Sequence, residues 1–333
     1  MKSSLKVFLL ICLPCLLISC GGGGGSGSAT SSQTYQTVAA VGELLTYTVD
    51  LQKLKYAYEI TESAYGLLGS KGEGTLTANG DGTYTPSGFS AGRFRVLENG
   101  LMYGSIYEDF NADGNKEVVP VLGVSNPISS ASDAQGVYNF VSRQCVIAGC
   151  VANYGTLKIN SDGTWQRCNR GNLGVTPASP ACVSSSNGTY VNFSGGKADK
   201  YVNGQKVGTF IFFKDSYNQK VILTDLNGAD ASLGKGAFFA SSQGFPSSVE
   251  GTWFGTNTAG TVAKAVISGS SLVDTGVTAS GMAYGPLNST FQLNQPWTGM
   301  ATISPGGSVG MLTGSGMGVT ANISSNHISI GVR

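Results

Sequence analysis

The feature that most constrains the fold is a short segment that occurs twice. Residues 74–84 (GTLTANGDGTY) recur as residues 155–165 (GTLKINSDGTW), 81 positions later. In each copy a run of alternating apolar and polar residues ends at an Asp-Gly pair, which supplies the positive φ angles of a tight hairpin turn. The sequence therefore predicts antiparallel β hairpins as the repeated structural element.

Further matches extend this similarity. Residues 99–106 match residues 203–210, and residues 116–118 match residues 220–222, both at an offset of 104. The two offsets differ by 23 residues, which predicts an insertion between positions 168 and 203 of the second copy. Chance matching is the alternative, because 49 of the 333 residues are glycine.

No window of the sequence shows a sustained helical apolar stripe, whereas strand-like alternation between Gly, Asn and Asp turns is frequent. We therefore predict an all-β chain of tandem related antiparallel units. A single unit of this kind buries little apolar surface by itself, so we expect the two units to pair into one barrel or a packed sandwich.

The charge balance limits the classes of partner. Charged residues make up 12% of the chain, against about 25% in an ordinary soluble domain. Without Lys2 and Lys6, which lie in the N-terminal leader, 18 basic residues face 19 acidic ones. Since no basic excess is available to neutralise phosphates, nucleic acid is not an expected partner.

The N-terminus predicts export. Residues 1–19 combine Lys2 and Lys6 with an apolar stretch that is too short to span a bilayer, as in a signal peptide. The sequence Leu17-Ile-Ser-Cys20 resembles the lipobox of bacterial lipoproteins. That resemblance implies cleavage before Cys20, acylation of Cys20, and, because glycine follows, attachment to the outer membrane on its periplasmic or external face. An ordinary secretory signal is the alternative.

The rest of the chain divides by composition. Residues 20–34 hold the lipidated cysteine and a Gly/Ser-rich linker, which is expected to be a flexible tether. We expect β unit 1 at residues 35–125, β unit 2 at 126–248 and an uncharged C-terminal β segment at 249–333. The glycine stalk resembles that of surface lipoproteins of Gram-negative bacteria with β-barrel bodies, including the transferrin-binding and factor-H-binding kinds.

The C-terminal segment is unusual in its charge. Between residues 275 and 332 there is no Asp, Glu, Lys or Arg. Such strands lack the charges that prevent association between sheet edges, so they must be paired or covered, and we expect them to complete the sheet of unit 2. At the start of the segment, Gly251-Thr-Trp253 resembles the first strand of lipocalin-type barrels, although a generic core tryptophan is the preferred interpretation.

Four cysteines remain after the signal and the anchor are set aside: Cys145, Cys150, Cys168 and Cys182. An even number in an exported chain favours two disulfides, and we favour the local pairs 145–150 and 168–182. Zinc is disfavoured because the spacings lack the C-x₂-C pattern and the only histidine, His327, is distant in sequence.

One loop has the residue types of a cation site. Oxygen-bearing side chains stand at alternate positions around a glycine, and the D-x-N-x-D-G core resembles calcium loops of the EF-hand, dockerin and integrin-like propeller types. Pro120 occupies the twelfth position, where an EF-hand has its glutamate, so an EF-hand is excluded. The alternatives are a calcium site and a plain exposed turn. The candidate ligands are Asp109, Asn111, Asp113, Asn115 and Glu117.

These features predict a membrane-anchored cell-envelope lipoprotein that acts as a binding or structural β module for an unknown protein or glycan, without catalytic residues. Gly306-Gly-Ser308-Val-Gly310 fits G-x-S-x-G, but no acid lies between Ser308 and His327, so a nucleophile elbow is not expected. Two alternatives stay open: a lipocalin-like carrier of a small ligand, and a calcium-dependent polysaccharide hydrolase that would use a pair of acids such as Glu108, Asp109 or Glu250.

Overall fold

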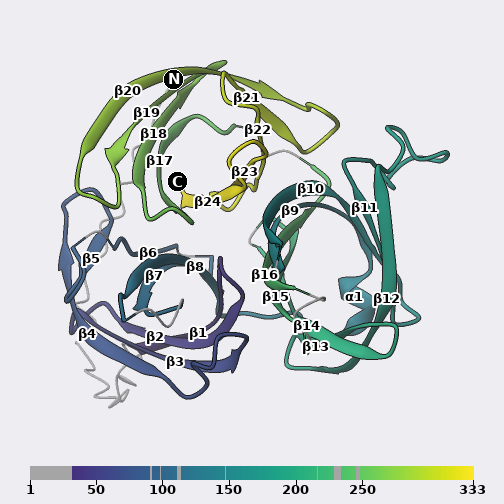
Figure 1. Ribbon diagram of the computed structural model, residues 1–333, viewed down its shortest axis with the longest axis horizontal. Helices are drawn as coiled ribbons and strands as arrows, with labels where there is room; N and C mark the ends of the chain where they lie inside the picture. Colours follow the sequence, from purple (N-terminus) through teal and green to yellow (C-terminus); the bar gives the residue numbers. More distant parts are fainter. Residues whose placement is uncertain are drawn as a thin grey trace, which may run out of the picture.

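The computed structural model describes residues 32–90, 92–97, 99–110, 114–146, 148–215, 217–228, 234–244 and 248–333. Within these residues the chain is almost entirely antiparallel β structure, as the alternation predicted. It forms three eight-stranded sheets, one after another along the chain, and Figure 1 shows them as three rings arranged around a common centre.

In the first sheet the first five strands pair in chain order, and so do the last three. The first strand also pairs with the eighth, which gives the spatial order β5-β4-β3-β2-β1-β8-β7-β6. A β-bridge between Tyr84 and Phe94 links its two ends, and we call this sheet the first barrel. Its strands are β1 (Ser32–Ala39), β2 (Glu43–Asp50), β3 (Lys55–Ser63), β4 (Lys71–Ala78), β5 (Tyr84–Pro86), β6 (Arg95–Val96), β7 (Leu101–Glu108) and β8 (Glu117–Val124).

The second barrel is closed by pairing of its first strand with its last. The short helix α1 (Ala131–Ala134) precedes it and lies within its ring in Figure 1. Its strands are β9 (Gly136–Val146), β10 (Gly149–Ile159), β11 (Thr164–Asn169), β12 (Ser184–Ser194), β13 (Lys197–Val202), β14 (Gln205–Lys214), β15 (Lys220–Asn227) and β16 (Lys235–Ser242).

The third barrel is closed in the same way. Its strands are β17 (Gly251–Asn257), β18 (Val262–Ser268), β19 (Ser271–Val277), β20 (Ala283–Leu293), β21 (Ala301–Ser304), β22 (Ser308–Leu312), β23 (Met317–Asn322) and β24 (His327–Val332). Trp253 lies on its first strand and is buried in the core of this barrel.

Two expectations about assembly were wrong. The first two units do not pair into one barrel or sandwich, because each has enough strands to join its own first strand to its last. The C-terminal segment does not complete the sheet of the second unit either. Closure of β17 on β24 removes free strand edges, which explains how a segment without charged residues avoids edge association.

The repeated hairpins share their turn geometry. Thr83 and Thr164 each donate a backbone N–H to the preceding Asp81 or Asp162 side chain at 2.9 Å, and an asparagine amide bonds each threonine hydroxyl at 2.9 Å. The glycine of each turn has φ near +80°, which favours glycine over residues with a Cβ.

These matching hairpins hold different places in their barrels. Residues 74–84 span the fourth and fifth strands of the first barrel, whereas residues 155–165 span the second and third strands of the second barrel. The segment where the sequence predicted an insertion contains β12 and β13, at a point where the first barrel has only the two-residue strand β6. The similarity is therefore one of hairpins within a closed ring, and the copies do not share one strand order.

The three barrels meet over a shared apolar core. Strand β14 contributes to it because its residues are buried on both faces: Phe210 and Phe212 point into the second barrel, while Ile211 and Phe213 belong to the shared core outside it. Polar contacts complete the interfaces. Trp297 Nε1 donates to Asn139 Oδ1 at 2.8 Å, and Lys206 Nζ pairs with Glu62 Oε2 at 3.2 Å.

Candidate functional site

The interior of the second barrel is closed at one end and open at the other. At the closed end the Tyr138 hydroxyl donates to the Ala134 carbonyl of α1. Above this lies a layer of fully buried aromatic rings: Phe140, Trp165, Phe210 and Phe238. At the other end a pocket of about 330 Å³ opens, which is at the small end of the range for ligand sites.

We call this pocket the cup. Its walls come from all the strands between β9 and β15, and they mix aliphatic, amide and hydroxyl side chains. Trp165 of the aromatic layer lines it, together with two cations, Arg167 and Lys200. The other lining residues are Gln144, Val151, Asn153, Asn169, Ser186, Val202, Val207 and Leu226.

The strand register points both cations into the barrel. Arg167 lies two residues after Trp165 on β11, so it shares the inward face, and Lys200 pairs with Tyr190 of β12, another residue of the interior cluster. The pairing of β13 with β14 shifts its register between Lys200 and Tyr201. Arg167 is 9% exposed and Lys200 is 4% exposed, so both cations are largely removed from water.

Aromatic faces hold the two cations. Lys200 Nζ lies 4.7 Å from the ring centroid of Trp165, and the Arg167 guanidinium carbon lies 5.0 Å from that of Phe140. Both cations lie 5.7 Å from the Phe238 ring. Arg167 Nε also donates to Asn169 Oδ1 at 2.8 Å, whereas Lys200 makes no hydrogen bond or ion pair with any described residue.

Burial changes the protonation of both groups. Desolvation lowers the pKa of Lys200 to about 7, with a further lowering from the positive charge of Arg167. Desolvation also lowers the pKa of Arg167 to about 10. No carboxylate contributes to either shift, which agrees with the absence of acidic side chains from the cup lining in the described residues.

Two disulfides brace the rim of the cup. Cys145–Cys150 joins the ends of β9 and β10 next to the lining residue Gln144, with Cα atoms 3.9 Å apart. Cys168–Cys182 ties the β11–β12 connection to the wall beside Arg167 and Asn169, with Cα atoms 5.1 Å apart. The structure thus forms both of the local pairs that the sequence favoured.

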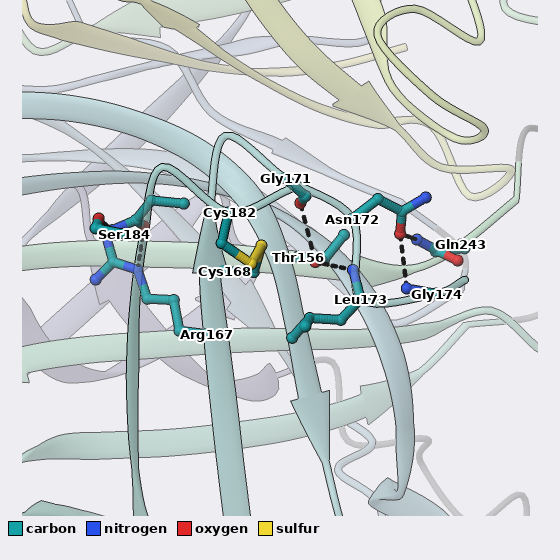
Figure 2. The surroundings of a disulfide bond; sticks show 11 residues. Thr156, Arg167, Cys168, Gly171, Asn172, Leu173, Gly174, Cys182, Ser184 and Gln243 are labelled. Carbon is teal, nitrogen blue, oxygen red and sulfur yellow. Dashed lines mark hydrogen bonds between the residues drawn. A yellow bond between two sulfur atoms is a disulfide. The ribbon is translucent and has the colours of Figure 1, made fainter. Parts of the chain in front are cut away.

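The β11–β12 connection is also held by hydrogen bonds, as Figure 2 shows. The Thr156 hydroxyl donates to the Gly171 carbonyl at 3.0 Å and accepts from the Leu173 N–H at 2.8 Å. Asn172 Oδ1 accepts from Gln243 Nε2 at 2.9 Å. These hydrogen bonds hold the connection against the outer wall of the second barrel, although the connection has little secondary structure.

The candidate calcium loop lies elsewhere, after β7 of the first barrel. Asp109 Oδ2 accepts a hydrogen bond from the Gly114 N–H at 2.9 Å, a contact that an ordinary turn also makes. Asn115 and Glu117 are described, whereas Asn111 and Asp113 lie outside the described residues. In the described parts of the chain, no three His, Cys, Asp or Glu side chains gather in a way that could hold a metal.

A larger cavity of about 1010 Å³ lies where the three barrels meet. Glu117 of the candidate loop lines it together with the Cys145–Cys150 disulfide. Three cations also line it, namely Lys116, Arg143 and Lys235, and Lys235 Nζ lies 4.2 Å from the ring centroid of Tyr65. The cavity brings together predicted site residues that are distant in sequence, but its cations have nearby acidic and aromatic partners.

The acids considered for hydrolysis have structural partners. Glu108 Oε1 accepts from the Tyr58 hydroxyl at 2.7 Å, and Glu250 Oε1 accepts from the Gly269 N–H at 2.8 Å. Ser308 begins strand β22 in a hairpin, a setting without the strand-to-helix turn of a nucleophile elbow. His327, the single histidine, is half-buried, and its Nδ1 lies 3.0 Å from Thr258 Oγ1.

Sequence reasoning missed the two cations of the cup. The alternation on β11 was visible around Trp165, but Lys200 lies on a strand whose register shifts, and a lysine in a strand is usually exposed.

Helix α1 has four residues, and no helix in the described ranges has the length and hydropathy of a membrane span. No protein-family model and no curated protein sequence matches this chain.

Proposed function

We propose that the protein is a lipid-anchored binding module of the cell envelope, and that its second barrel is a carrier for a small ligand. Cys20, which follows the predicted signal, would hold it on the outer membrane, and the Gly/Ser-rich linker would give the barrels reach. The protein or glycan partner that the sequence suggested becomes, in this proposal, a small molecule bound in the cup.

The observation that carries the proposal is the open end of a barrel that is otherwise closed. Hydrogen bonds run around the whole wall of the second barrel, and α1 covers one end. Trp165 and four aliphatic side chains give the cup its apolar surface, and amide, hydroxyl and cationic side chains line the rest of it. Sites for small molecules in proteins also combine apolar surface with placed polar groups.

Anchoring is tested by metabolic labelling with a radioactive fatty acid in a Gram-negative host. We expect label on the wild-type chain and no label on Cys20→Ala. A labelled Cys20→Ala chain, or an unlabelled wild type that is exported normally, would remove the lipoprotein part of the proposal.

Ligand uptake is tested on residues 21–333, which contain all three barrels and lack the acylated cysteine. The probe is N-phenyl-1-naphthylamine, a neutral aromatic compound whose fluorescence rises in apolar surroundings. Ser186 lines the cup, whereas Asn187, the next residue of β12, is exposed on the outer face. We expect Ser186→Phe to weaken probe binding at least tenfold, about 1.4 kcal/mol, and Asn187→Phe to leave it unchanged.

Equal binding by the two variants, or no binding by the wild type, would contradict a ligand site in the cup. Circular dichroism of both variants distinguishes a blocked cup from an unfolded barrel. Because the two substitutions add the same side chain to neighbouring positions of one strand, any general effect of the added ring appears in both.

A further inference from the structure

The positive charge in the cup is not balanced by acidic side chains in its described lining. Arg167 and Lys200 both line the cup, and no acidic side chain is among its lining residues in the described parts of the chain. Burial of two like charges without a counter-charge is costly, since each loses its hydration and each repels the other. Structural reasons alone favour apolar residues at such positions.

The aromatic rings compensate for only part of this cost. A cation near an aromatic face gains less free energy than a buried ammonium loses in hydration. Lys200 Nζ has three donors and no acceptor among the described residues. Arg167 uses one donor on Asn169 and a long contact of 3.5 Å to Ser142, so other guanidinium N–H groups are free to bind an acceptor.

A hydroxyl in the same region is also without a partner. Thr224 is fully buried and pairs in register with Phe210 on one side and Phe238 on the other, the rings next to Lys200. Its Oγ1 makes no hydrogen bond. The cup thus presents an unpaired ammonium and a partly unpaired guanidinium, which together are complementary to an oxygen anion. The unpaired Thr224 hydroxyl is buried next to the aromatic layer, outside the cup lining.

We propose that the cup is a binding site for an organic anion, a small molecule with one carboxylate or sulfonate group on an aromatic or apolar body. This deepens the proposed function and rests on it. The acidic group accepts hydrogen bonds from Lys200 and Arg167 at the floor. The body extends toward the mouth between aliphatic side chains such as Val202 and Leu226. The volume of about 330 Å³ admits one small molecule of this kind.

Proton uptake accompanies binding in this account. A bound anion favours the charged form of Lys200, so it raises the lowered pKa of that group. Arg167 is the other charged group in the described lining of the cup, and it stays protonated because its pKa is about 10. The inward tyrosines Tyr138 and Tyr190 stay neutral, since burial raises their pKa. Affinity for an anion should therefore fall as the pH rises above 7, whereas affinity for a neutral compound should not.

The test compares two probes with one aromatic skeleton. 8-Anilino-1-naphthalenesulfonate carries a sulfonate, and N-phenyl-1-naphthylamine does not. Titrations use residues 21–333 at pH 6.5 and pH 8.5, with Lys200→Met as the test variant. Lys158→Met is the matched control, because Lys158 lies on the outer face of β10.

We expect Lys200→Met to weaken sulfonate binding at least tenfold at pH 6.5 and to leave the neutral probe within twofold of the wild type. Lys158→Met should change neither, and wild-type affinity for the sulfonate should be weaker at pH 8.5 than at pH 6.5. If Lys200→Met binds each probe with the same affinity as the wild type, the proposal of an anion site is wrong, whereas the proposal of a ligand site in the cup is retained. If neither probe is sensitive to Ser186→Phe, the cup itself is wrong.

Discussion

Lys200 and Arg167 approach the same aromatic ring inside the second barrel. The Lys200 Nζ and the Arg167 guanidinium carbon each lie 5.7 Å from the centroid of Phe238, and the charge of Arg167 lowers the pKa of Lys200. Two cations that share one ring without a nearby acid form an arrangement that costs folding energy. Such a cost is typical of sites where function, rather than stability, selects the residues.

The first prediction concerns the stability of Lys200→Met. The pKa of Lys200 in the folded chain, about 7, is lower than its ordinary value of 10.5, so between these values the unfolded chain binds more protons. The free energy of unfolding therefore rises with pH across this window, by up to about 1.4 kcal/mol per pH unit. Lys200→Met should abolish this rise and stabilise the chain by about 1–3 kcal/mol at pH 6.5.

Urea unfolding of the two proteins at pH 6.5 and pH 9 measures this difference. The stabilisation should be larger at pH 6.5, where Lys200 is charged, than at pH 9. A Lys200→Met protein that is less stable than the wild type at both pH values would show that the ammonium is compensated in the folded barrel.

The second prediction concerns Glu43, which is fully buried at the start of β2. Its Oε1 accepts from the Ser63 hydroxyl and the Ala64 N–H, both at 3.0 Å, while Oε2 has no hydrogen-bond partner. Desolvation raises its pKa from 4.5 to about 7. The folded chain therefore binds more protons between these values, and stability from this group is lost as the pH rises through that window.

Replacement by the neutral isostere tests the sign. Glu43→Gln should leave the melting temperature unchanged at pH 4.5 and raise it at pH 8, by the equivalent of about 1–3 kcal/mol. Calorimetry at the two pH values measures the effect. A lower melting temperature for Glu43→Gln at pH 8 would mean that the ionised carboxylate is stabilising.

The third prediction concerns the rim disulfides. Cys168–Cys182 spans 14 residues, and the chain-entropy relation gives about 3 kcal/mol for a loop of this length. Cys168→Ala/Cys182→Ala should therefore destabilise the chain by about 2–3 kcal/mol and weaken probe binding in the cup. The smaller Cys145–Cys150 loop spans 5 residues, so its removal should cost less.

Chemical unfolding of the two double variants ranks the disulfides. The reverse order of destabilisation would show that loop length does not govern their contribution. Unchanged probe binding in the Cys168→Ala/Cys182→Ala protein would show that the β11–β12 connection does not shape the cup.

The fourth prediction concerns the loop at residues 109–117. If it binds calcium, a chelator should lower the melting temperature of the wild type and have no effect on Asp109→Asn. Scanning calorimetry with EDTA and with added calcium measures this. An unchanged melting temperature in the wild type would leave the loop as an exposed turn held by the Asp109 to Gly114 hydrogen bond.

Local structure was predictable where local chemistry decides it. The hairpin turns follow from Asp81-Gly82 and Asp162-Gly163, because the side chain of each aspartate and the positive φ of each glycine act within a few residues. The two disulfides were also predictable, since each closes a short loop. These parts of the fold depend on neighbours in sequence.

Barrel closure and the cup depend on distant pairings. Strand β9 pairs with β16 about a hundred residues later, and nothing local in either strand specifies that partner. The inward direction of Lys200 depends on the register of β13, which shifts immediately after it. A one-residue change of register reverses the face of every side chain, so the charged floor of the cup could not be predicted from the sequence.

The most direct test of the account is the titration of the Lys200 side chain itself. Residues 21–333, labelled with ¹³C at the lysine ε-carbon, give a resonance that Lys200→Met assigns by its loss. We expect this resonance to titrate near pH 7 in the free protein and at least one pH unit higher with saturating 8-anilino-1-naphthalenesulfonate. A Lys200 signal that titrates at the same pH with and without the sulfonate would contradict an anion site at the floor of the second barrel.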